Sequence, residues 1–148
     1  MRRDRFVRAY GELHGDVQDV FGADFSVPLH LGEPTLYPAK RNMAFCAYGA
    51  GDNGDEIIIF VAPKLLKGPP ERIEAILRHE LAHAIEFHMG EPELRTWAKS
   101  QGKTLPPGME RRADAVAEIL WGDPIYYDEI LVQTLDRGIR PRPKHLGL

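Results

Sequence analysis

The sequence predicts a single α+β domain in which a small, mainly antiparallel sheet of about three strands packs against one long helix and further helices. Three observations lead to this prediction. Segments with alternating apolar residues, the period of a half-buried strand, gather between residues 25 and 61. Segments with apolar residues three or four positions apart, the period of an amphipathic helix, lie before and after them. The length of 148 residues suits one domain with one core, and we find no internal repeat.

The first helix is expected from Arg3 to Phe21. Gly11 and Gly15 weaken it, but the apolar residues keep the helical spacing. They are Phe6, Tyr10, Leu13, Val17, Val20 and Phe21. The arginines at positions 2, 3, 5 and 8 are expected on its solvated side, where they could also contact an acidic partner.

Three strands are expected next, at residues 25–31, 43–48 and 56–61. Pro28 lacks a backbone N–H, which confines the first strand to an edge of the sheet or places the proline at its start. The Gly, Asn and Asp content of residues 49–55 is typical of a turn, so the second and third strands form a hairpin. The third strand, Glu56–Val61, is the densest in β-branched residues and gives the strongest strand signal.

The remaining helices are expected at residues 70–89, 91–100 and 109–121, with a last one from Asp123 to about residue 135. Pro70 suits a first helical position, and Gly90 suits the end of the same helix. Trp97 is the expected anchor of the second of these helices. Residues 137–148 are rich in proline and positive charge, which predicts an extended basic tail.

The composition indicates a cytoplasmic protein that does not enter a membrane. Its longest strongly apolar run, residues 57–62, is far shorter than the ~20 residues that cross a bilayer, and the N-terminus shows no secretory signal. Cys46 is the only cysteine, which excludes an intrachain disulfide and a cysteine-rich zinc site. The net charge of -3 gives no reason to expect nucleic acid to bind across the whole surface.

The longest predicted helix contains the run His79-Glu80-Leu81-Ala82-His83, an H-E-x-x-H motif. Residues four apart share one face of a helix, so His79 and His83 can direct two imidazole nitrogens at one metal ion. Glu80 is rotated away from the ligand direction but stays close enough to take a proton from a water that the metal activates. The motif therefore predicts half of a zinc site and a general base. A bare H-E-x-x-H run also occurs by chance in unrelated amphipathic helices.

A catalytic zinc site needs a third protein ligand, and the candidates are His88, the carboxylates of the 109–121 helix and His145. His88 would lie ~7.5 Å beyond His83 along the helix axis, too far to reach the same ion. A metzincin pattern is excluded, because it requires glycine and histidine where this chain has Glu86 and Met89.

The 109–121 helix carries Glu110, Asp114 and Glu118 at every fourth position, so their carboxylates lie along one face. The ordinary interpretation of such a stripe is a solvated acidic surface. Beside it lies a face of mostly small apolar residues that would let this helix pack closely against the H-E-x-x-H helix. These residues are Ala113, Val116, Ala117 and Leu120.

With the E-x-x-A-D run that begins at Glu110, the two motifs resemble those of the gluzincin zinc metallopeptidases. The chain is most similar to the compact ImmA/IrrE-like members, with Ala117 and Leu120 also in register over roughly residues 56–123. The resemblance implies a minimal zincin-like domain that binds one Zn²⁺ per chain. It further implies that Glu110 is the third zinc ligand and that Asp114 accepts a hydrogen bond from His79. Glu118 has no part in the motif and is expected at the surface or rim.

The implied activity is that of a zinc-dependent endopeptidase acting on a protein or peptide, with Glu80 as general base. Related peptidases bind substrate as an added antiparallel strand, and Glu56–Val61 is the strand expected to supply the free edge. Tyr126, Tyr127, His88 and His145 are candidates for stabilising the oxyanion.

Two alternatives stay open. The first is a catalytically inactive zinc-binding domain used for partner recognition or regulation. The second is a nucleic-acid-associated protease, suggested by the basic termini. The substrate and the oligomeric state do not follow from the sequence.

Overall fold

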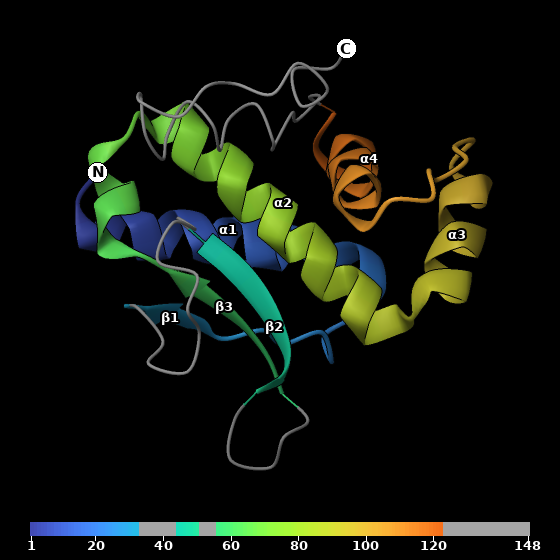
Figure 1. The fold of residues 1–148 in the computed structure, drawn as a ribbon, viewed down its shortest axis with the longest axis horizontal. Coiled ribbons are helices and arrows are strands. Elements are labelled where there is room, and N and C mark those ends of the chain that lie inside the picture. The colour runs from blue at the N-terminus through green and yellow to red at the C-terminus, as the bar shows by residue number, and fades with distance from the viewer. Residues whose placement is uncertain (33–43, 51–55, 123–148) are drawn as a thin grey trace.

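The computed structural model describes residues 1–32, 44–50 and 56–122, and it shows a mixed α+β domain (Figure 1). The chain begins with helix α1 (Arg3–Phe21) and then forms strands β1 (Leu29–Leu31), β2 (Ala44–Ala50) and β3 (Glu56–Val61). A short 3₁₀ helix, η1 (Pro63–Lys67), leads to helices α2 (Pro70–Met89), α3 (Glu91–Ser100) and α4 (Met109–Trp121). These bounds confirm the four predicted helices that the described residues include. The helix predicted from Asp123, the tail at 137–148 and the turn at 51–55 lie outside the described residues.

The sheet has the strand order β1-β3-β2. β3 pairs with β2 in antiparallel fashion, which confirms the predicted hairpin, and with β1 in parallel. The prediction that β3 supplies a free edge is therefore wrong, because β3 is the central strand. In the described part of the chain, the edges are β1 and β2.

The first strand is shorter than the alternating pattern predicts, because Phe25 and Val27 are buried but are not paired with another strand. Side chains of α1 bind this segment instead. Val27 donates its N–H to His14 Nε2 at 3.0 Å, and its carbonyl accepts a hydrogen bond from the Tyr10 hydroxyl at 2.6 Å. Gln18 likewise donates to the Phe25 carbonyl at 2.8 Å. The alternation therefore reflects burial against α1. Hydrogen bonding to β3 begins only at the Pro28 carbonyl, which accepts from the Ile59 N–H at 3.1 Å.

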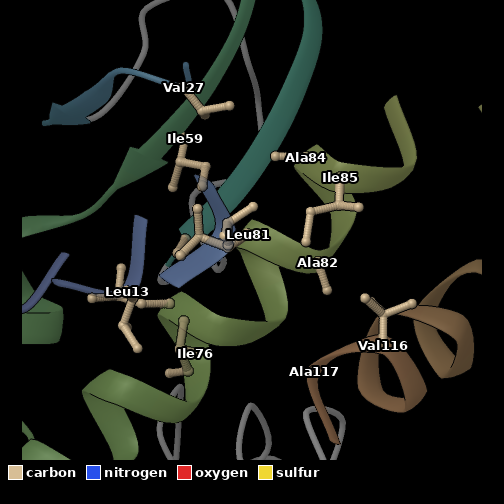
Figure 2. Packing of buried hydrophobic residues seen from close by; sticks show 14 of the residues in the cluster. Leu13, Val27, Ile59, Ile76, Leu81, Ala82, Ala84, Ile85, Val116 and Ala117 are labelled. Carbon is tan, nitrogen blue, oxygen red and sulfur yellow. The ribbon is translucent and has the colours of Figure 1, made fainter. Parts of the chain in front are cut away.

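Helix α2 crosses the middle of the molecule, with the sheet on one side and α4 on another (Figure 1). Leu81 of α2 meets Leu13 of α1 and Ile59 of β3 in one cluster of buried residues (Figure 2). Toward α4, the side chains are smaller, and the fully buried Val116 and Ala117 lie against α2. The predicted small-residue face of α4 is confirmed, and it lets the two helices approach closely.

Helix α3 is attached at the far end of α2, where Gly90 has a positive φ of 88° and turns the chain. Leu94 and Ala98 are buried, and the ring of Trp97 lies 4.9 Å from that of Phe21, in keeping with its predicted anchoring role. Among the described helices, none combines the length and apolarity that a membrane span requires.

Candidate metal centre

Three side chains from two helices converge where α2 and α4 face each other. His79 and His83 of α2 direct their Nε2 atoms to the same point, 3.0 Å apart. From α4, Glu110 Oε1 lies 2.5 Å from the Nε2 of His83 and 3.6 Å from that of His79. In the described residues, this is the one group of three His, Cys, Asp or Glu side chains suited to holding a metal ion. The structure therefore brings the H-E-x-x-H motif of α2 next to the E-x-x-A-D motif of α4, as the sequence predicts.

The spacing of these atoms fits a zinc ion. Ligand atoms ~2.0–2.1 Å from a tetrahedral zinc lie ~3.3 Å from one another, and the three separations of 2.5, 3.0 and 3.6 Å bracket that value. Two imidazoles and a carboxylate also match the ligand chemistry of catalytic zinc. The side chain of Glu110 is 50% exposed, so the group opens to the surface on the α4 side.

Asp114 contacts the His79 ring on the side opposite Glu110. Its Oδ1 lies 2.8 Å from Nδ1 of His79, on the ring nitrogen that faces away from Glu110. A hydrogen bond there keeps the proton on Nδ1 and leaves Nε2 free to bind a metal. The one-turn spacing of Glu110 and Asp114 thus lets a single helix contact both nitrogens of one imidazole.

Without a metal, the electrostatics of the group favour a protonated His79 beside an ionised Glu110. Burial lowers the pKa of His79, but hydrogen bonds to Asp114 and Glu110 and the charge of Glu80 outweigh it and raise the pKa to about 9. Burial opposes ionisation of Glu110, yet hydrogen bonds from His79 and His83 hold its pKa far below the usual range. A divalent cation would take the place of that proton.

Glu80 is 3% exposed, and its charge acts on the neighbouring His79. Burial raises the pKa of the Cys46 thiol well above its usual range, and the negative charge of Glu80 raises it further. The carboxylate therefore lies between the ligand face of α2 and strand β2. A buried carboxylate in this place suits a proton acceptor next to a metal.

The sequence did not reveal the arginine that fastens α4 to α2. Arg112 is 5% exposed and donates from Nε and Nη2 to the two oxygens of Glu86, at 2.7 and 3.2 Å. Its Nη2 also lies 3.0 Å from Glu91 at the start of α3, and its Nη1 donates to the Pro107 carbonyl. Glu86 is three residues after His83, and Arg112 lies between Glu110 and Asp114. This ion pair therefore fixes how the two motifs face each other.

His88 does not join the metal group. Nine positions separate it from His79, so the two side chains leave opposite faces of α2 at 100° per residue. Its ring packs edge-on against Phe25 at 5.4 Å, and its Nε2 lies 4.0 Å from Asp24. The structure thus gives no support to His88 as an oxyanion stabiliser.

Glu118 is exposed, as expected for a residue outside the motif. The other candidates for that oxyanion role, Tyr126, Tyr127 and His145, lie outside the described residues.

No family model matches the chain, and neither a curated protein nor a solved structure does. The chemistry of the site is therefore inferred from its own geometry. Two imidazoles, the carboxylate of Glu110 and a nearby buried carboxylate could hold a Lewis-acidic cation and accept a proton beside it.

Proposed function

We propose that this protein is a zinc-dependent endopeptidase of the gluzincin type. The observation that carries the proposal is the position of Glu110 and Asp114, which approach opposite nitrogens of His79 from one turn of α4. A chance H-E-x-x-H run would not be accompanied by this pair. The resemblance of the two motifs to those of gluzincins supports the same assignment.

Each residue has a defined part in peptide hydrolysis. A zinc ion bound by His79, His83 and Glu110 would lower the pKa of a water toward ~7 and polarise the peptide carbonyl. Glu80 accepts the proton of the attacking water and delivers it to the leaving amine. Asp114 keeps the His79 ring in one tautomer and one orientation.

Strand β2 is the edge that suits the substrate, in place of β3. It lies against α2, and in the described residues it pairs on one side only. An extended peptide can add to such an edge through backbone hydrogen bonds, which need no particular sequence. The peptide would then lie across the side of α2 that carries Glu80.

The test combines zinc analysis with a peptide-library digest of the purified protein. The wild type is expected to carry about one zinc per chain and to cleave peptides. Glu80→Gln should retain zinc and lower cleavage by about 10²- to 10⁴-fold, the usual contribution of a general base. Glu110→Gln should lose zinc, whereas Glu118→Gln, on the same helix face, is the matched control that keeps it.

Each result separates one hypothesis from another. Full cleavage by Glu80→Gln would contradict the assigned mechanism. One zinc per chain without any cleavage by the wild type would favour the alternative, a zinc-binding domain that recognises partners. A wild type purified without zinc, and unable to bind it, would overturn the metal centre.

A further inference from the structure

An aromatic pair joins the edge strand to the metal-binding helix. The rings of Tyr48 on β2 and Phe87 on α2 are stacked, with centroids 5.6 Å apart and planes at 27°. Tyr48 is 62% exposed, more than any other large hydrophobic side chain in the described part of the chain. The pair therefore presents an aromatic surface to solvent at the junction of β2 and α2.

The position of Phe87 on α2 places this surface in line with the proposed catalytic residues. Phe87 follows Glu80 by seven positions, which is close to two full turns, and follows His83 by four. Residues with these spacings share a face of the helix. The rise of 1.5 Å per residue puts Phe87 ~6 Å beyond His83 and ~10 Å beyond Glu80 along the axis.

The contacts between β2 and α2 also give the relative direction of the two elements. Cys46 and Tyr48 are two positions apart, so both face α2 from the same side of the sheet. Cys46 lies near Glu80, whereas Tyr48 lies against Phe87, seven residues later. Strand β2 and helix α2 therefore run in the same direction.

We propose that Tyr48 and Phe87 form a subsite that selects an aromatic side chain two or three residues before the cleaved bond. This inference rests on the proposed peptidase function. A peptide added antiparallel to β2 runs from the Tyr48 end toward Glu80, so its N-terminal part meets the aromatic pair first. The axial rise of ~6–10 Å from Glu80 and His83 to this pair corresponds to two or three extended residues at ~3.3 Å each.

The chemistry of the surface suits an aromatic partner. Aromatic rings prefer offset-stacked or edge-to-face neighbours, and an exposed tyrosine on a packed phenylalanine offers both an accessible face and an accessible edge. The pair is also held in place before binding, because Phe87 is half buried on a helix. We expect a preference of about tenfold or more for an aromatic residue over alanine at that peptide position.

The test measures kcat/KM of the zinc-loaded protein for two peptides that differ only at this position, phenylalanine against alanine. Tyr48→Ala should lower the ratio of the two values about tenfold, while Tyr48→Phe should preserve it. Phe87→Leu should lower it in the same way. Val20→Ala, which shortens an exposed apolar side chain on α1, is the control that should leave the ratio unchanged.

Three outcomes would overturn the subsite. The first is an unchanged ratio of the two kcat/KM values in Tyr48→Ala despite normal zinc content. The second is a lower melting temperature of this variant without a change in selectivity. The third is a peptide-library preference for aromatic residues located after the cleaved bond. The first two would make the stack a purely structural contact. Absence of cleavage by zinc-loaded wild type would instead remove the peptidase function, and the subsite with it.

Discussion

A single imidazole connects the two motifs of this protein. His79 is fully buried, and its two nitrogens face two carboxylates of α4, Glu110 and Asp114. In the metal-free protein the ring keeps a proton that the metal would otherwise displace. Zinc affinity is therefore expected to rise with pH up to about 9, the pKa of His79.

The stability of the metal-free protein should change with pH in the opposite direction. The pKa of His79 is about 9 in the fold and 6.5 for an ordinary histidine. Below pH 6.5 the ring is protonated in both states and its contribution is complete, and as pH rises to 9 only the folded state retains the proton. The loss is on the order of 3 kcal/mol. Urea unfolding of metal-free protein at pH 6 and pH 9 measures it.

The His79→Gln variant is the control for this measurement. Glutamine cannot titrate, so the decline between pH 6 and pH 9 should be clearly smaller in the variant. Equal declines in both proteins would assign the pH dependence to other groups.

At the scale of elements, the sequence predicts the helices better than the strands. Pro70 and Gly90 delimit α2 through local backbone chemistry, so its predicted bounds match the structure. The alternation from Phe25 correctly predicts burial, but it does not tell whether a strand or the side chains of α1 supply the hydrogen bonds. The density of apolar residues in β3 likewise gives no position in the sheet until its neighbours are known.

The candidate site shows the same division between local and distant information. Ligands at positions i and i+4 follow from helix geometry, so His79 and His83 could be predicted from spacing alone. The approach of Glu110 needed a resemblance between motifs. The pairing of Arg112 with Glu86 bridges 26 positions and leaves no periodic signal in either helix.

The ion pair of Arg112 and Glu86 should hold α4 in position on α2. Arg112→Met leaves the nearly buried carboxylate of Glu86 without its main partner and should destabilise the fold by about 3 kcal/mol. Zinc affinity should fall as well, because α4 loses its fixed position on α2. Denaturant unfolding and a chelator competition measure the two effects.

The double variant Glu86→Met with Arg112→Met separates packing from charge. Replacing both partners by apolar side chains removes the unpaired, nearly buried carboxylate of Glu86 and should recover most of the lost stability. If the double variant is as unstable as Arg112→Met, the loss comes from packing or from the Glu91 and Pro107 contacts of Arg112.

At the scale of the whole molecule, the candidate metal-binding residues His79, His83 and Glu110 come from two parts of the fold. These parts, the core around α2 and helix α4, differ in how much apolar area they bury. Helix α2 is covered by α1 and the sheet, and its core residues Ile76, Leu77 and Leu81 are fully buried. Helix α4 packs on α2 through small side chains, which bury less apolar area per residue. Glu110, the proposed third ligand, belongs to this second part.

Removal of zinc should therefore loosen α4 before it affects the rest of the domain. Zinc that binds only the folded state stabilises it by about 2.7 kcal/mol at a free concentration of 100 times its dissociation constant. In hydrogen exchange with a chelator present, amides of α4 should exchange faster, while those of β3 and the central turns of α2 change little. Glu110→Gln in the presence of zinc should reproduce this pattern, and Glu118→Gln should not.

A uniform increase in exchange across α1, β3 and α4 would contradict the local model of opening and would make the metal a determinant of the entire fold. The expected pattern instead follows from the placement of the proposed ligands. Helix α2 holds its two histidines through the hydrophobic core, whereas α4 would rely on Arg112 and on the bound ion to keep Glu110 within reach of them.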